Sequence, residues 1–588
     1  MNDFLASRLK DLRHIMTKSK VDYFLVPMSD ENQTEYVPHD ARRLRYITGF
    51  SGSAGFAIIG LKTAVLFVDG RYTLQAKQEV SEQLFEHHDL HGYPPHSWLS
   101  EKVQPHEVIG VDGWLITQKQ FEAFQSSTKE KKVTIKNVEQ NFIDQIWHNK
   151  PEKIVTPIEE HPLEYSGVSH TQKITNLAAK LNEKKVDAVF ISLLDSIAWL
   201  FNIRAQDIPQ HPMVRGYALL NAQGKAKLFV NKNQIQPVLS KFLGDDIKLI
   251  DLTKMTEHLQ QEKMAHIWLD KTTVPHQVWN LFEKENARIY DDIDPCQYPK
   301  AIKNKAESNG AKHAHIQDGA ALCQYFAWLY RSVPFKPISE CEAADQLETF
   351  RKKREKFKSI SFTTISAADD HGAIVHYSPQ AETQNNITAQ SIYLVDSGGH
   401  YLNGTTDVTR TLCFGTPSQE QKDRYTRVLK GHIALSQVIF PKGTSGKALD
   451  CLARQYLWQI GADFKHGTGH GVGSYLCVHE GPQNFGRNIA LETGMIISNE
   501  PGFYKEGAYG IRIENLIIVT ESSYEGFYGF ETLTLAPYDH KLMDLSLLTA
   551  DEIDWINTYH QRVWEEISPL VDVDTKDWLR EATNAITI

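Results

Sequence analysis

The chain has few cysteines and no long hydrophobic run. All six cysteines lie in the C-terminal half of the 588 residues, without a CxxC pair. This usage predicts buried thiols in a reducing compartment and argues against a disulfide framework. No stretch approaches the roughly 18 uncharged apolar residues of a membrane-spanning helix. The N-terminal segment MNDFLASRLKDLRHIM carries charges through every turn and predicts no signal peptide, so we expect the cytoplasm.

The chain also lacks a strong charge of either sign. Its formal charge of −10 is small for this length, and 41% hydrophobic with 23% charged residues is an ordinary globular composition. The basic segments KDLRHIMTKSK and RKKREKFK are short and lie in helical patterns, which argues against a nucleic-acid or membrane surface. The length predicts several domains, because one domain usually has roughly 100–200 residues.

An internal similarity divides the first half of the chain. A helical pattern at 3–19 precedes the strand VDYFLVP (21–27), and a second at 171–184 precedes VDAVFIS (186–192). Two diverged copies of one α/β module are therefore expected, followed by a larger α+β domain. Proline-rich and charged segments near 150–160 and 293–305 predict the boundaries. The predicted domains are 1–152, 153–300 and 301–588, the last with a C-terminal extension.

Four carboxylates of the last domain lie in unusual places. Asp396 ends the strand pattern SIYLVD, Asp407 lies in a second strand pattern, and Glu500 ends the apolar run GMIISN. Glu514 shares one face of the strand YGIRIEN with Arg512. Three of them have an ordinary alternative when taken alone: a turn for Asp396, a solvated edge for Asp407 and an Arg–Glu contact for Glu514. Together with one histidine, their charge of −4 matches two divalent cations, Mn²⁺ or else Co²⁺, Fe²⁺ or Zn²⁺. Two metals roughly 3.5–4 Å apart can share a nucleophilic hydroxide.

The segment HGTGHGVGSYLCVHEGP (466–482) is rich in both histidine and glycine. A phosphate loop is a poor interpretation, because Val472 and Ser474 stand where the third glycine of GxGxxG would fall. The segment PKGTSGKAL has Ala448 where a Walker loop needs Ser or Thr, and no HExxH occurs. The pattern alone does not say which histidine binds a metal.

Several motifs in combination resemble the Xaa-Pro aminopeptidases (aminopeptidase P) of the pita-bread metallopeptidases. They are IVHY, VDSGGHYLNGTTDVTRT, HGTGHGVGSYLCVHEGP, SNEPGFY and GIRIEN, in the order and approximate spacing of that family. The segments RRLRYITGFSGSAG, FVDGRYTLQA and FETLTLAPYD resemble its long, three-domain cytosolic form. The resemblance implies two related creatinase-N-like α/β modules followed by a pita-bread catalytic domain, and a homodimer.

The resemblance also implies a dinuclear site, usually with Mn²⁺. Asp396 would bind one metal, Asp407 and Glu514 would bridge both, and His470 and Glu500 would complete the other. A metal-bridging hydroxide would then remove the N-terminal residue from peptides whose second residue is proline. Glu500 is the expected proton acceptor, with His376 and His479 orienting substrate and relaying a proton. The further expected substrate-binding residues are His466 at the proline subsite, Tyr504 and Arg512.

Three alternatives stay open. A prolidase would cleave only Xaa-Pro dipeptides with the same ligands, although the long three-module architecture favours the aminopeptidase. A metal-free, creatinase-like hydrolase should lack this ligand set. A non-catalytic pita-bread module would bind peptides or histones after losing its ligands. Arg71 is open between a substrate contact and an ion pair, whereas His371 and His400 are expected to be structural.

Overall fold

The computed structural model describes residues 2–587, which form two compact units. One unit comprises the chain up to His161 together with Val168–Gln297, and the other comprises Pro162–Gly167 with the chain from Tyr298 onward. No helix among the described residues is both long and apolar enough to cross a membrane. All six cysteines are free thiols. Cys296, Cys323 and Cys413 are buried as expected, whereas Cys341 and Cys477 are only partly buried and Cys451 is exposed, so the expectation of buried thiols is wrong for these three.

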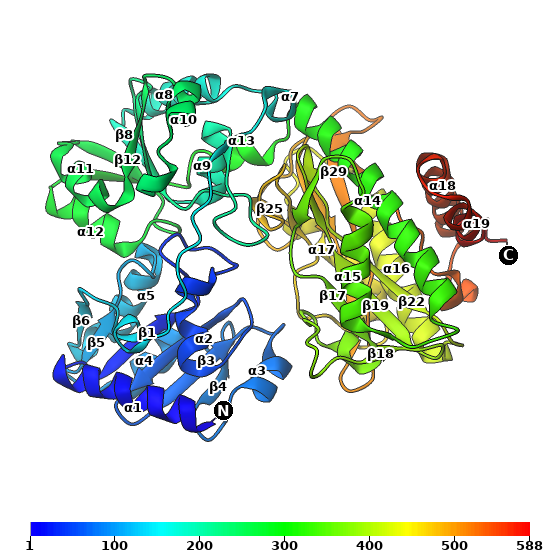
Figure 1. The fold of residues 1–588 in the computed structure, drawn as a ribbon, viewed down its shortest axis with the longest axis horizontal. Coiled ribbons are helices and arrows are strands. Elements are labelled where there is room, and N and C mark those ends of the chain that lie inside the picture. Colours follow the sequence, from blue (N-terminus) through cyan, green and yellow to red (C-terminus); the bar gives the residue numbers. More distant parts are fainter. Residues whose placement is uncertain (1, 588) are drawn as a thin grey trace. The chain divides into compact units, whose positions relative to one another are not determined.

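The first unit contains two six-stranded sheets with the same strand order (Figure 1). The orders are β4-β3-β2-β1-β5-β6 and β12-β11-β10-β8-β13-β14, and the matching pairs run in the same relative directions. This agreement confirms the predicted repeat. The strands are β1 (Tyr23–Pro27), β2 (Gly55–Gly60), β3 (Ala64–Val68), β4 (Glu86–Asp89), β5 (Val108–Val111), β6 (Thr134–Asn137), β8 (Ala188–Ile191), β10 (Tyr217–Asn221), β11 (Ala226–Val230), β12 (Ile247–Asp251), β13 (His266–Leu269) and β14 (Arg288–Asp291).

One helix precedes the first strand of each module, as the sequence predicts. Helix α1 (Asn2–Lys18) buries Leu5, Leu9, Leu12 and Met16 on one face, which is the spacing of an amphipathic helix. Helix α8 (His170–Lys184) begins after Ser169, whose side chain accepts a hydrogen bond from Gln172 N. Further helices of this unit are α2 (Arg43–Thr48), α3 (Thr73–Glu79), α4 (Pro95–Lys102), α5 (Gln118–Thr128), α9 (Leu194–Phe201), α10 (Pro237–Leu243), α11 (Met255–Gln261) and α12 (His276–Lys284).

The second unit is built from two halves, each a sheet covered by a pair of helices (Figure 1). In one half, α14 (Lys305–Ser332) and α15 (Glu340–Arg351) pack on the sheet β17-β19-β22. In the other, α16 (Gln419–Gln437) and α17 (Gly446–Trp458) pack on the sheet β23-β30-β29-β26-β24-β25. The strands of these two sheets are β17 (Ile365–Ala368), β19 (Ile392–Ser397), β22 (Val408–Cys413), β23 (Phe440–Pro441), β24 (His470–Gly471), β25 (Glu480–Asn484), β26 (Ile496–Asn499), β29 (Asn515–Glu521) and β30 (Phe527–Thr532).

Smaller elements complete the second unit. The short helix α13 (Gln297–Ala301) leads into it, and the hairpin β27 (Gly502–Lys505) and β28 (Tyr509–Arg512) lies between β26 and β29 along the chain. A small sheet contains β16 (Phe357–Ile360), β20 (Gly399–Tyr401) and β21 (Gly404–Thr405). The C-terminal helices α18 (Ala550–Ile567) and α19 (Val573–Ala582) share a core with α14 and α16. Side chains from both halves and from the C-terminal segment therefore form one interior.

Candidate metal centre

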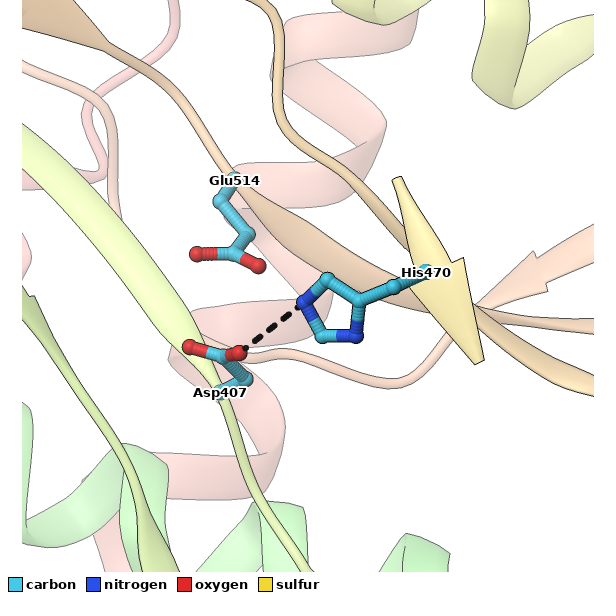
Figure 2. A group of neighbouring side chains, drawn as sticks. All are labelled: Asp407, His470 and Glu514. Atoms are coloured by element: carbon cyan, nitrogen blue, oxygen red, sulfur yellow. Dashed lines mark ion pairs between the residues drawn. The ribbon is translucent and has the colours of Figure 1, made fainter. Parts of the chain in front are cut away.

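Three side chains of the second unit converge on one point. Asp407, His470 and Glu514 each offer one ligand atom, and these atoms all lie within 4.8 Å of one another. Figure 2 shows the three side chains pointing toward one another from separate segments of the chain. The His470 Nε2 atom lies 3.5 Å from Asp407 Oδ2 and 3.3 Å from Glu500 Oε1. One imidazole thus faces the carboxylates that the sequence singled out.

The ligand candidates lie where strands begin or end. Asp396 is the second-last residue of β19, and Asp407 lies directly before β22. Glu500 follows β26, and Glu514 lies between β28 and β29. The expectation that Asp407 and Glu514 lie inside strands is therefore wrong. Residues outside a strand do not follow the alternation of side chains between the two faces of a sheet. The side chains of Asp407 and Glu514 can therefore both point toward the same site.

Burial and mutual repulsion dominate the electrostatics of this cluster. Burial raises the pKa of Asp407 well above its ordinary value, and the neighbouring carboxylates of Asp396 and Glu500 raise it further. Burial also raises the pKa of Glu514 well above its ordinary value, and the Asp407 carboxylate raises it further. Arg512 opposes the repulsion, since its Nη2 lies 2.6 Å from Asp396 Oδ2. One guanidinium against four carboxylates leaves an excess of negative charge that a cation would neutralise.

The polar atoms of the site fit divalent cations. Asp396 Oδ1, Asp407 Oδ1 and Glu514 Oε1 are buried and have no hydrogen-bond partner among the described residues. Such orphaned acceptors destabilise a protein unless another group binds them. The His470 Nδ1 atom lies 3.0 Å from its partner Gly471 O, an arrangement that leaves Nε2 as the free ligand atom. Carboxylate oxygens with one imidazole suit hard or borderline cations such as Mn²⁺.

Two hydroxyl residues that the sequence analysis missed support these carboxylates. Thr409 Oγ1 donates to Glu514 Oε2 at 2.8 Å and accepts from Arg512 Nε at 3.2 Å. Ser498 Oγ donates to Glu500 Oε1 at 3.0 Å and accepts from His470 N at 2.9 Å. Thr409 follows Asp407 by two positions, and Ser498 precedes Glu500 by two. This spacing near a strand is a signal that could have identified both residues.

A chain of hydrogen bonds joins three of the expected substrate-binding residues to Asp396. Arg512 Nη1 donates to Tyr504 OH at 2.8 Å, and Tyr504 OH lies 2.8 Å from His466 Nε2. Arg512 thus binds Asp396 and Tyr504 and reaches Glu514 through Thr409, so the direct Arg512–Glu514 pair considered from the sequence is replaced by a relay. His466 is buried, and its Nδ1 lies 2.8 Å from Gly467 O.

The two remaining candidate catalytic histidines are both partly exposed. The His479 ring lies against the His470 ring, with centroids 4.2 Å apart and an interplanar angle of 75°. His376 lies in the segment that leads from β17 to β19. That segment is held by the fully buried Glu340, which binds Tyr377 OH at 2.8 Å and His371 Nδ1 at 3.0 Å. It also packs on β28, because a Cβ atom on Gly510 would meet Gly372 O at 1.7 Å.

The residues expected to be structural have partners inside the protein. His371 binds Glu340 as described, and the buried His400 lies with its Nδ1 3.0 Å from Thr405 Oγ1. In the first unit, Arg71 forms an ion pair with Asp69, with Nη2 2.6 Å from Oδ2. This pair is the structural alternative considered for Arg71. A substrate contact of Arg71 stays a prediction.

The sequence analysis also missed Arg410, which joins the C-terminal segment to the metal centre. Its guanidinium is buried and donates to Glu514 O at 2.7 Å, Asn515 Oδ1 at 2.8 Å and Tyr559 OH at 3.0 Å. It also donates to Ala536 O at 2.7 Å. The backbone of the expected bridging residue Glu514 is therefore fixed to α18 through one side chain.

Comparison with known proteins follows the same division of the chain. Residues 309–521 match metallopeptidase family M24, and residues 526–586 match the C-terminal region of that family. Residues 8–145 and 149–307 each match a creatinase/prolidase N-terminal domain. The architecture is thus two creatinase-type α/β modules followed by a pita-bread domain, as predicted.

Relatives match over the whole length. Proteins from Paracoccidioides lutzii and Aspergillus niger, each named a probable Xaa-Pro aminopeptidase P, are 39% identical over 99% of both chains. The crystal structure of an X-prolyl aminopeptidase from Caenorhabditis elegans, described as a cytosolic enzyme with a di-nuclear active site, matches with a TM-score of 0.95. It is 32% identical and covers 99% of this chain and 100% of that one. The chain therefore belongs to metallopeptidase family M24, in its Xaa-Pro aminopeptidase P group.

Proposed function

We propose that this metallopeptidase removes the N-terminal residue from peptides whose second residue is proline. The observation that carries the proposal is the match at 39% identity over 99% of both chains to proteins named as probable Xaa-Pro aminopeptidases. The match includes both N-terminal modules, so it concerns the whole architecture and not the catalytic unit alone. The geometry supports the proposal, because all five expected ligands lie in one unit and three of them converge on one point. A fourth, Glu500, has its Oε1 atom 3.3 Å from His470 Nε2.

The chemistry of the Xaa-Pro bond determines which groups the site must provide. An Xaa-Pro peptide bond is a tertiary amide without an N–H group, and proline restricts the backbone on both sides. Two divalent cations, when bound, supply Lewis acidity for the scissile carbonyl and lower the pKa of the attacking water. Asp396, Asp407, His470, Glu500 and Glu514 would hold them. The leaving proline nitrogen must also gain a proton.

The chain's own residues provide for the proton transfers. Glu500 is partly exposed and bonded to Ser498, so it can accept the proton of the attacking water. His479, against the His470 ring, and His376 can orient the substrate and deliver a proton to the leaving nitrogen. His466, Tyr504 and Arg512 form the chain of hydrogen bonds described above, and we assign His466 to the proline subsite.

The finer assignments belong to the same proposal. We propose Mn²⁺ as the metal, because the donor set is rich in oxygen. We also propose that the protein is a homodimer and acts in the cytoplasm, since the Caenorhabditis elegans relative is described as a cytosolic enzyme. We also propose domains of 1–152, 153–300 and 301–588. Light scattering on the purified protein, with metal analysis of the same sample, measures mass and metal content together. A monomeric mass would refute the dimer without affecting the reaction.

A length series of peptides tests the reaction. Arg-Pro, Arg-Pro-Pro and longer peptides beginning Arg-Pro-Pro are incubated with the metal-free protein and added Mn²⁺, and released arginine is measured. We expect release from the longer peptides and none from matched peptides with alanine in place of the first proline. A protein that releases no arginine from any peptide, with both metals bound, would refute the proposed function.

A dipeptidase is the second candidate. A solved Xaa-Pro dipeptidase from Bacillus anthracis is 25% identical with a TM-score of 0.52, and it covers 63% of this chain. This relative has the catalytic fold without the full length. Hydrolysis confined to Arg-Pro in the length series would favour the dipeptidase.

A further inference from the structure

A second buried cluster of charges lies directly beside His479. The Glu480 side chain is 0% exposed and contacts two lysine ammonium groups, on side chains that are each 1% exposed. Lys303 Nζ binds Glu480 Oε1, and Lys300 Nζ lies 3.2 Å from Oε2. Gln483 Nε2 also lies 3.4 Å from Oε1. None of these residues is an expected metal ligand or substrate contact.

Stability alone does not explain this arrangement. Transfer of an ion from water to a protein interior costs several kcal/mol even after relaxation, and apolar residues of similar volume often stabilise a fold as well as a buried ion pair. Here two lysine ammonium groups contact one carboxylate in the interior. Two fixed ammonium groups define the position of one carboxylate, so the cluster imposes a geometry on Glu480.

The two lysines are themselves fixed to the sheet. Lys300 lies in α13, and Lys303 lies between α13 and α14, where its backbone N donates to Gly494 O at 3.1 Å. The neighbouring Ile302 forms a β-bridge with Met495, the residue before β26. Lys303 Nζ also donates to Lys300 O at 3.1 Å. The lysines are thus anchored next to the strand that leads to Glu500.

Glu480 in turn fixes the segments that carry two histidines. Its backbone pairs with Gly471, the residue after His470, and it directly follows His479. The glycines of HGTGHGVG make room for it, since a Cβ atom on Gly471 would meet Glu480 O at 2.4 Å. A Cβ atom on Gly473 would lie 3.1 Å from Glu480 Oε2. Displacement of Glu480 would therefore move both rings of the perpendicular His470–His479 pair.

We propose that Glu480, tethered by Lys300 and Lys303, is a positioning residue that sets the orientation of His479 against His470. The inference rests on the proposed function, because His479 acts in that reaction. A group that serves a scissile bond must be held closely, and a displacement of about 1 Å can lower the rate about 100-fold. Glu480 touches neither substrate nor metal and acts through its neighbour.

A double-mutant cycle between Glu480→Gln and His479→Ala tests this role. In the otherwise unchanged chain, Glu480→Gln should lower kcat about 10- to 100-fold and change KM less than about 3-fold. In the His479→Ala background the same change should lower kcat less than about 3-fold further, because the residue through which it acts is gone. An equal loss in both backgrounds would overturn the proposal.

Two further variants separate positioning from folding. Glu552→Gln breaks a matched buried pair, Lys430 Nζ–Glu552 Oε2 at 2.5 Å, between α16 and α18. It should lower the melting temperature and leave kcat per folded molecule unchanged. If Glu480→Gln does not fold, the charge-free variant Lys300→Met/Lys303→Met/Glu480→Met replaces it, and wild-type kcat in that variant overturns the proposal.

Amide hydrogen exchange of the metal-free protein gives a readout that does not depend on activity. Exchange at residues 478–481 should rise at least about 10-fold in Glu480→Gln and stay unchanged in Glu552→Gln. Unchanged exchange in Glu480→Gln overturns the proposal. A wild-type protein that hydrolyses no Xaa-Pro peptide refutes the proposed function instead, and the exchange experiment then decides whether Glu480 orders the His479 segment.

Discussion

Replacement of Asp407 by asparagine should make the metal-free protein more stable while it removes the metal-dependent activity. Asp407 is buried, one of its oxygens has no hydrogen-bond partner among the described residues, and neighbouring carboxylates repel it. Asparagine has the same shape, no charge and an amide N–H that can donate to a neighbouring carboxylate. The substitution therefore removes repulsion without leaving a cavity.

The size of the effect follows from the geometry. At the 4.8 Å limit that contains the ligand atoms of Asp407 and Glu514, two unit charges repel by about 3 kcal/mol at an effective dielectric constant of about 20. Burial and the neighbouring carboxylates raise the pKa of Asp407, so protonation relieves part of this repulsion more readily than it would for an exposed carboxylate. We therefore expect a gain of about 1–2 kcal/mol, or an increase of about 2–3 °C in melting temperature for a unit of this size.

Thermal unfolding with and without metal is the assay. The wild-type protein, stripped with a chelator, should gain about 3 kcal/mol when Mn²⁺ is added at about 100 times its Kd, whereas Asp407→Asn should gain almost nothing. Asp539→Asn is the control, because that buried carboxylate is satisfied by Tyr330 OH and Cys413 N. It should melt lower and keep the metal-induced gain. If metal-free Asp407→Asn melts below the metal-free wild type, or gains as much from Mn²⁺, the reasoning is refuted.

Three further perturbations test separate parts of the site. Gly510→Ala should lower kcat/KM at least about 10-fold, because the new Cβ would displace the segment carrying His376. Gly529→Ala, whose Cβ would have its nearest neighbour, Val438 O, at 3.8 Å, should not; equal effects would contradict this. The hydrogen bond to Glu340 raises the pKa of His371, so the stabilisation of that segment is complete below about pH 6.5 and is lost as pH rises through the raised value. Intrinsic-rate-corrected amide exchange at 369–377 should therefore be faster at high pH, and His371→Gln should abolish the dependence. Arg410→Met should destabilise the protein by at least about 3 kcal/mol, because several buried acceptors lose their donor; chemical denaturation measures this, and an unchanged midpoint would refute it.

Much of the fold could be predicted from hydrophobic periodicity. The helix expected at 171–184 is α8 (His170–Lys184), and the repeated strand signal at 21–27 and 186–192 corresponds to β1 and β8. Outer strands of the modules were harder to predict. The strand β4 consists of Glu86–Asp89, whose residues are polar and at most half-buried, so no apolar pattern marks it. Such a strand is fixed by pairing with β3 and not by its own residues.

The sequence predicts which residues form the site, but not which side chains they contact. Carboxylates at the ends of apolar runs are conspicuous, because burial of a charge needs a partner. The partner itself cannot be read from spacing when it comes from far along the chain. Arg512 binds Asp396, which lies 116 positions away, and Glu480 binds Lys303, which lies 177 positions away. Only the packing of the two halves of the unit decides those contacts.

The four carboxylates of the candidate metal centre come from both halves of the second unit. Asp396 and Asp407 lie at the ends of strands of one half of the second unit, Asp396 within β19 and Asp407 directly before β22. Glu500 and Glu514 lie next to strands of the other half. Neither half holds a complete set, and Glu514 is fixed through Arg410 to α18, which begins at Ala550. A chain that ends before this helix lacks the hydrogen bond from Arg410 to Tyr559 that links the Glu514 backbone to α18. Because neither half contains all four carboxylates, the ligand set is complete only when both halves have folded against each other.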